Sequence, residues 1–199
     1  MAILLGGMGA LHAEDSRDYE AGPLQISDFR AKVPEGKSNQ AFTLTTLRYS
    51  YRYRSRTRDR SASVVLTKLD FKNKMLRDQS WNGRPQDTAL LAHEQGHFDI
   101  TEAVRKRAEQ YFQAKLSSLR TTGRTLDDAV AAMEELVRKE MAPYFLRLEL
   151  LQKKYDLETN HGLATERQQQ WSKLVSELIE NPQLPFPPLG DEPAAAPPR

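Results

Sequence analysis

Apolar residues recur every three to four positions from Asp87 to about Leu119. This period predicts one long amphipathic helix with a buried face. Pro85 and Asp87 mark its expected start and Thr121-Thr122-Gly123 its expected end, as capping preferences indicate. Chemically active side chains between these limits are therefore held on a helix, at known angles around its axis.

The helix contains the sequence His93-Glu94-Gln95-Gly96-His97. Histidines four positions apart lie on one helical face about one turn from each other, so both imidazoles can reach a single ion. Glu94 points roughly 100° around the helix from His93, which suits a carboxylate that binds the water of the ion instead of the ion. Zinc favours imidazole nitrogen and lowers the pKa of its bound water to about 7. The motif predicts a zinc hydrolase in which His93 and His97 bind the metal and Glu94 is the catalytic base.

Gly96 lies inside this predicted helix, where glycine costs about 1 kcal/mol relative to alanine. Such a glycine usually has a structural reason, such as the close approach of another group to the backbone. We expect a substrate or a neighbouring strand to approach the helix at this point.

A third metal ligand is expected from a distant part of the sequence, because a catalytic zinc has three protein ligands and one open position. The chain has four histidines, and His12 lies in the extreme N-terminal segment. His161 is therefore the predicted third ligand, since it lies in the polar segment Tyr155–Gly162, where a loop could return it to the first helix. The alternative is a glutamate of the following helix, namely Glu134, Glu135 or Glu140.

Two residues near His161 have predicted roles at the site. Asp156 could orient a ligand imidazole, since metal-bound histidines usually have such a partner. Tyr155 could donate a hydrogen bond to the oxyanion that develops during hydrolysis. In the structural interpretation they are a solvated acid and an aromatic residue at a helix end. Asp99 and Glu102 lie off the face of the two motif histidines and are weak ligand candidates.

Residues Phe42–Phe71 have the period-two pattern of β-strands. Tyrosines occupy odd positions and arginines even positions, as Tyr49, Tyr51 and Tyr53 and as Arg48, Arg52, Arg54, Arg56, Arg58 and Arg60. A second alternation, in which Val65, Thr67, Leu69 and Phe71 share one face, predicts the partner strand of a hairpin that turns across Ser55–Ser61. The arginine strand could bind a polyanion, but we expect a solvated face that discourages edge pairing.

Two more helices are predicted after the first. Leu126 to about Tyr155 follows Thr125 as N-cap, and Pro143 is expected to kink or split it. Ala164–Ile179 forms the last helix and places Trp171 on a buried face. The sequence therefore predicts an α+β fold, with an N-terminal antiparallel sheet followed by the long histidine-bearing helix and further helices.

Composition sets the outer limits. With 199 residues, 39% of them hydrophobic, the chain suits one domain at residues 14–180 with short terminal segments. It contains no cysteine, so a zinc site here must use nitrogen and oxygen ligands. The formal net charge of +2 gives no indication of nucleic-acid binding, and none is expected.

Both ends of the chain have a distinct composition. Residues 1–13 form an apolar run that is typical of the apolar part of a signal peptide and is too short to span a bilayer. We therefore expect a secreted or periplasmic protein without an integral membrane segment. Residues 181–199 contain seven of the eleven prolines and are predicted to be a disordered tail.

The two histidine segments together resemble a known bacterial family. The motif with its continuation Phe98-Asp99-Ile100, followed by Tyr155-Asp156, Thr159, His161-Gly162 and Trp171, is similar to the predicted secreted zinc-dependent proteases, a family catalogued as a domain of unknown function. The resemblance extends from about Pro23 to Trp171 and includes Asp28-Phe29. It implies a metallopeptidase, with His93, His97 and His161 as zinc ligands and Glu94 as the catalytic base.

We therefore expect a zincin-like domain that hydrolyses peptide bonds of a protein or peptide substrate with one zinc ion, in the cell envelope or outside the cell. Two alternatives belong to other functional classes. One is a zinc-stabilised envelope binding protein without catalytic activity. The other is a polyanion-binding module that uses the strand from Arg48 to Arg60.

Overall fold

The computed structural model describes residues 3–4, 15–38 and 40–189. Its strands are β1 (Ile3–Leu4), β2 (Ser16–Asp18), β3 (Ala41–Phe42), β4 (Thr45–Arg58), β5 (Ser61–Leu76), β6 (Trp81–Asn82) and β7 (Arg120–Gly123). Its α-helices are α1 (Thr88–Lys115), α2 (Leu126–Thr159) and α3 (Thr165–Glu180), and its 3-10 helices are η1 (Tyr19–Ala21), η2 (Ile26–Asp28), η3 (Arg77–Gln79) and η4 (Leu116–Ser118). The predicted α+β class, with an antiparallel sheet and three helices, is confirmed.

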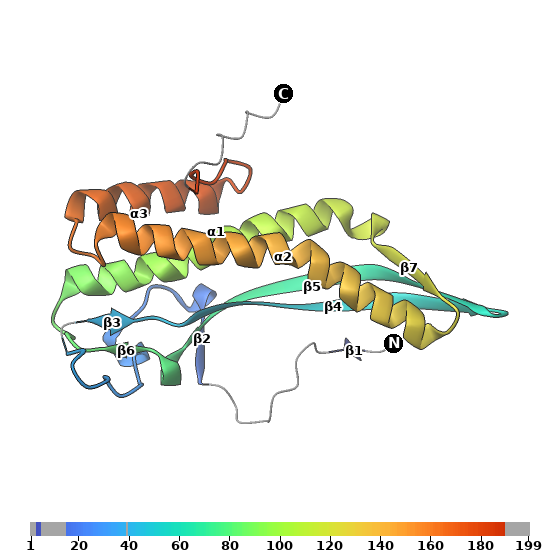
Figure 1. Cartoon of the computed structure of the whole chain (residues 1–199), viewed down its shortest axis with the longest axis horizontal. Helices are drawn as coiled ribbons and strands as arrows, with labels where there is room; N and C mark the ends of the chain where they lie inside the picture. Colours follow the sequence, from blue (N-terminus) through green and yellow to red (C-terminus); the bar gives the residue numbers. More distant parts are fainter. Residues whose placement is uncertain (1–2, 5–14, 39, 190–199) are drawn as a thin grey trace.

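The larger sheet has the strand order β1-β4-β5-β2, with β7 paired to β5, and β3 pairs with β6 in a small second sheet. The helices lie over one face of the β4–β5 hairpin, which extends beyond them at one end (Figure 1). The core between the layers is built from fully buried side chains of the sheet and of α1 and α2, including Val64, Val104, Phe112, Met133 and Val137. Trp171 of α3 is also buried in this core, as predicted.

The hairpin turns at Asp59-Arg60, inside the predicted segment, and β4 continues to Arg58. Tyr51 is buried, whereas the arginines at even positions of β4 are exposed. The predicted two-faced strand is therefore confirmed.

The predicted apolar face of β5 is wrong at Val65, which faces the same side as Arg54, and at Thr67, which is exposed. Thr67 has no partner in β4, because Arg52 pairs with Lys68 and the next residue of β4 pairs with Leu66. An extra residue of this kind is a β-bulge, and it changes which side chains of a strand face the core. Even-numbered residues up to Leu66 are therefore buried, and odd-numbered residues are buried from Phe71 onward.

Helix α2 ends later than predicted. It runs through Pro143 without interruption and continues to Thr159, where Asn160 ends it in the left-handed conformation. Figure 1 shows α2 changing direction along its length. The predicted polar loop is thus largely helical, and Tyr155 and Asp156 are held on the last turns of α2.

The terminal segments are described only in part. Of the predicted signal segment at residues 1–13, only Ile3–Leu4 lies among the described residues, where it pairs with β4. Residues 190–199 of the predicted tail at 181–199 lie outside the described residues. In the described part of the tail, the Leu184 carbonyl accepts a hydrogen bond from the Arg107 guanidinium, which also lies 4.8 Å from the centre of the Phe186 ring. No helix in the described ranges has both the length and the apolarity that crossing a bilayer requires.

Candidate metal centre

Helix α1 holds the two motif histidines on one face, with ring centroids 4.8 Å apart. The Nδ1 atom of each ring has a partner on α2. His93 Nδ1 lies 3.4 Å from the hydroxyl of Thr159, which donates to the Tyr155 carbonyl, and His97 Nδ1 contacts the side-chain carbonyl of Gln152. Such partners fix the orientation of a ligand imidazole. In both rings they leave Nε2 directed at the same place.

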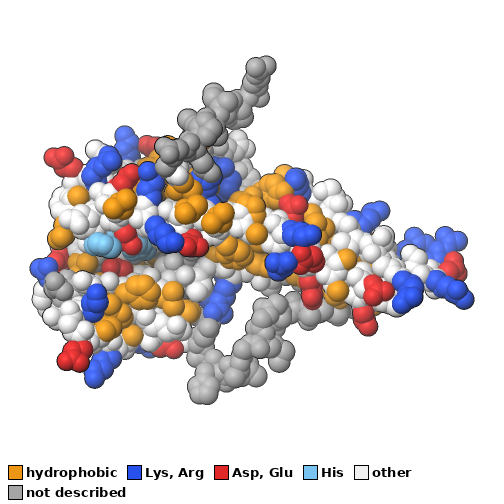
Figure 2. Space-filling view, in the orientation of Figure 1, with side chains coloured by type: hydrophobic (Ala, Val, Ile, Leu, Met, Phe, Trp, Pro, Cys, Tyr) orange, Lys and Arg blue, Asp and Glu red, His pale blue; other side chains and the backbone are white. Residues whose placement is uncertain are grey.

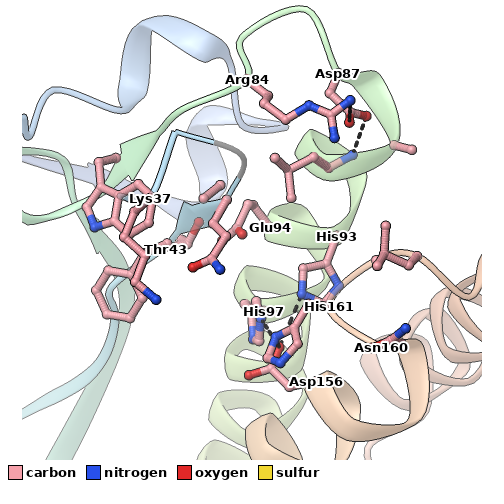
Figure 3. Close-up of a pocket in the computed structure, with 18 of the residues that line it drawn as sticks. Lys37, Thr43, Arg84, Asp87, His93, Glu94, His97, Asp156, Asn160 and His161 are labelled. Carbon is pink, nitrogen blue, oxygen red and sulfur yellow. Dashed lines mark hydrogen bonds and ion pairs between the residues drawn. The ribbon is translucent and has the colours of Figure 1, made fainter. Parts of the chain in front are cut away.

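That place is one oxygen of Asp156 (Figure 3). Asp156 Oδ1 lies 3.1 Å from His93 Nε2 and 3.0 Å from His97 Nε2, and it lies 3.5 Å from His161 Nδ1. Ligand atoms of His93, Asp156 and His161 lie within 4.8 Å of one another and form a group that could hold a metal ion. His97 is not a member of that group, although it contacts the same carboxylate oxygen. The fold therefore brings together the three histidines that the sequence singled out, and it adds Asp156 at their centre.

A left-handed turn after α2 returns His161 to α1. Asn160, His161 and Gly162 all have positive φ, at 47°, 51° and 87°. This conformation is uncommon for residues other than glycine and costs about 1 kcal/mol or more for each of them. At Gly162 an added Cβ would lie 2.9 Å from the Cβ of His93, so the turn is packed directly on the first histidine. The turn thereby positions an imidazole whose side chain is otherwise 76% exposed.

The charges around Asp156 favour its ionised form. Burial raises the pKa of Asp156, but hydrogen bonds from His93 and His97 outweigh burial and hold the pKa well below its usual range. Burial lowers the pKa of His97, but the hydrogen bond with Asp156 and the charges of Glu94 and Asp156 raise it above its ordinary value overall. A negative charge is therefore present at the point where a cation would bind.

Tyr155 packs under the motif instead of facing the site. Its ring stacks on His93 at 4.7 Å between centroids and meets His97 edge-on at 5.0 Å. Its hydroxyl donates to the His93 carbonyl at 3.2 Å, and burial raises its pKa. This geometry favours a positioning role for Tyr155 over the predicted donation to an oxyanion. Tyr155 is also the reason for Gly96, since an added Cβ at Gly96 would lie 2.2 Å from the Tyr155 hydroxyl oxygen.

Replacing Gly96 with alanine is expected to destabilise the protein by about 1–3 kcal/mol, because the methyl group overlaps a fully buried ring. Urea unfolding measures the change. In a Tyr155→Ala background the overlap is gone, and the same substitution should be neutral or stabilising, since alanine is the better helix former. An equal loss of stability in both backgrounds would contradict this explanation of Gly96.

Glu94 lines a cavity of about 800 Å³, together with the three histidines and Asp156. The cavity is bounded by residues 40–45 around β3, by the first turns of α1 and by the turn at 160–163 (Figure 3). Glu94 is 3% exposed, and its Oε2 has no hydrogen-bond partner among the described residues. A buried carboxylate oxygen without a partner is costly. Its position beside the cavity suits an atom that binds water or substrate.

The other acidic candidates have different partners. Asp99 accepts hydrogen bonds from Tyr19 and Gln95, and Glu102 pairs with Arg105. Glu135 forms an ion pair with Arg138, and Glu140 accepts a hydrogen bond from the Tyr111 hydroxyl. Neither these four acids nor Glu134 is among the described residues that line the cavity.

Two residues of the site were not assigned a role from the sequence, namely Gln152 and Thr159. Together with Tyr155 and Asp156 they recur at three-to-four spacing, so the signal was present. The segment after Tyr155 is polar, and polarity of this kind is typical of a loop, so the signal is weak. The buried face of the last turns of α2 is polar because it meets two imidazoles, not an apolar core.

Comparison with known proteins finds one family model, described as a bacterial protein of unknown function (DUF922), which matches residues 25–162. The chain belongs to this family. The match includes the motif of α1 and ends at Gly162, so it covers every residue of the candidate metal centre and leaves out α3. No curated protein and no solved structure matches the chain.

Proposed function

We propose that this protein is a zinc-dependent peptidase whose metal is held by His93, His97 and His161, with Asp156 beside them. The observation that carries the proposal is the convergence of three imidazoles on one point, next to a buried carboxylate with an unpartnered oxygen. A zincin-like fold, secretion and the identity of the metal are parts of the same proposal.

The donor atoms fit zinc. Imidazole nitrogen and carboxylate oxygen are its preferred ligands in a chain without cysteine. Thr159 and Gln152 contact the Nδ1 atoms, so the Nε2 atoms, which hydrogen-bond to Asp156 in this structure, are the ones that would bind an ion after losing their protons. Asp156 lies close enough to all three rings to bind the ion or to hold the rings in place. When bound, zinc supplies a Lewis acid that polarises a carbonyl and lowers the pKa of water.

Glu94 supplies the proton transfer in this proposal. Its carboxylate accepts a proton from the attacking water and then donates it to the nitrogen of the leaving amine. The bond that forms is between the water oxygen and the carbonyl carbon, and the bond that breaks is the peptide C–N bond. Because Glu94 follows His93 on α1, helix geometry keeps its carboxylate beside the histidines without placing it on their face.

The strand β3 offers an edge that can orient a polypeptide. The Gln40 carbonyl accepts a hydrogen bond from the Gly83 amide. The Leu44 amide donates to the Ser80 hydroxyl, and the Leu44 carbonyl accepts from the Leu76 amide. The backbone groups of these even-numbered residues therefore point towards β6 and the end of β5. In an antiparallel pair the alternate residues direct their backbone groups to the other edge. The backbone of Ala41 and Thr43 therefore faces the cavity, where an extended peptide could add as a strand.

Removal of the metal tests this proposal. Treatment with a chelator is expected to stop cleavage of an unfolded protein substrate, and addition of about one equivalent of zinc should restore cleavage, because one ion fills the site. Mass spectrometry of the products and metal analysis of the same sample measure both quantities. Cleavage that continues in fully metal-free protein would reject the proposal. Stoichiometric zinc with no cleavage of any protein or peptide would instead favour the non-catalytic binding protein.

A further inference from the structure

The β4–β5 hairpin carries a second feature, at the end of the molecule away from the metal centre. Basic side chains gather towards its tip (Figure 2). They lie on the sheet face opposite Tyr51, which is buried. We call them the basic face, which consists of Arg52, Arg54, Arg56 and Arg58 on β4, Lys68 on β5 and Arg120 on β7. All six are exposed.

The basic side chains are neighbours across the strands. Arg52 lies directly opposite Lys68, and Arg54 and Arg120 lie on either side of Val65. Like charges directly opposite each other destabilise a sheet. Asp70 offsets the charge of Lys68, so the repulsion that an external anion would relieve is that among the neighbouring arginines.

Most of these charges have no acidic partner. Lys68 pairs with Asp70, and Arg58 lies 3.9 Å from Asp59 in a fully exposed contact. The other four, which are Arg52, Arg54, Arg56 and Arg120, form no ion pair with any residue of the described ranges.

The exposed face of α2 shows the opposite pattern. Arg138 pairs with Glu135 there, and Lys153 pairs with Glu149. Single basic residues that form no ion pair within the described ranges also occur elsewhere, such as Lys32 and Lys173, so what distinguishes the basic face is that four of them lie together on neighbouring strands.

We propose that the basic face docks on the phosphates of an anionic phospholipid bilayer. Arginine binds phosphate through two parallel hydrogen bonds. Three neighbouring strands spread the cations over two dimensions, with about 7 Å between alternate residues of one strand, so the array is planar instead of linear. Single-stranded nucleic acids bind through aromatic stacking, and the described residues of this face include no aromatic side chain. A plane of phosphates matches the array better than a single polymer strand.

Docking at this end leaves the metal centre open. The cavity lies beside β3, β6 and the start of α1, whereas the basic face lies on the other face of the sheet from the helices and extends towards the projecting tip of the hairpin (Figure 1). The proposal does not rest on the proposed peptidase activity, because neither the basic face nor its test involves the metal.

Vesicle sedimentation tests the proposal with the full chain. Binding to vesicles that contain phosphatidylglycerol is expected, with little binding to phosphatidylcholine alone. The triple variant Arg54→Ser, Arg56→Ser, Arg58→Ser should bind the anionic vesicles roughly a hundredfold more weakly, since each basic residue contributes about fivefold near such a surface. Raising the salt from about 0.05 M to about 0.5 M should release the unmodified protein, because salt screens these attractions.

A matched variant removes the same charge elsewhere. This control is the triple variant Arg138→Gln, Lys139→Gln, Lys153→Gln on the exposed face of α2. It should keep at least about a third of the affinity of the unmodified protein for anionic vesicles. An equal loss in this variant would overturn the proposal, since net charge alone would then explain binding. Retention on soluble polyphosphate without vesicle binding would also overturn it, because the site would then be specific for a polymer.

Discussion

Replacing Glu94 with glutamine is expected to reduce peptide hydrolysis about a thousandfold, within the range that general acid–base catalysis contributes. Glutamine has nearly the same shape and keeps one carbonyl oxygen, but it cannot accept the proton of the attacking water. Because Glu94 lies off the helix face that carries His93 and His97, the variant should retain the metal content of the unmodified protein. Initial rates on a peptide and metal analysis of the same preparation measure the two quantities.

The matched control is Glu109→Gln, which removes a carboxylate from the same helix outside the cavity. It removes one ion pair of Arg105 and should leave the rate within about twofold, because Arg105 keeps its pair with Glu102 and neither residue lines the cavity. If Glu94→Gln hydrolyses peptide at the unmodified rate, Glu94 is not the base. If it loses both activity and metal, Glu94 is a ligand, and the proposed division of roles is wrong.

Replacing His161 is expected to weaken zinc binding by more than about a hundredfold. Loss of a residue that only hydrogen-bonds a metal ligand lowers metal affinity by about 10–100-fold, and loss of the ligand itself should have a larger effect. The side chain is 76% exposed, so its removal leaves no cavity in the core. Asparagine is the preferred replacement, since it tolerates the positive φ of this position better than alanine does. Competition with a chelating dye measures the affinity.

Leu163→Ala is the control, because Leu163 is an exposed residue of the same turn and also lines the cavity. Its zinc affinity should be unchanged. Unchanged affinity in His161→Asn, with strong loss in Asp156→Ala, would show that the carboxylate is the third ligand in place of the imidazole. Thermal unfolding of the metal-free variants separates loss of a ligand from loss of the fold.

The parts of this protein that follow a short period were predictable. The positions of His93, Glu94 and His97 relative to one another are fixed by the geometry of one helix, and the buried and exposed faces of β4 are fixed by the alternation of a strand. Failures occurred where one residue interrupts a period or where the pattern is polar. The extra residue Thr67 reverses the faces of β5, and the end of α2 is helical although its polar sequence is typical of a loop.

What the sequence alone determined is therefore a helix with two histidines and a carboxylate at defined angles, because backbone geometry sets those angles locally. Only the tertiary structure placed Asp156 among three imidazoles, turned His161 back through left-handed residues and set Tyr155 against Gly96. The contacts of His93, Gly96 and His97 with the end of α2 join residues more than about fifty positions apart, and no local period encodes them. They depend on how α1 and α2 pack against each other, and packing is decided by the whole core.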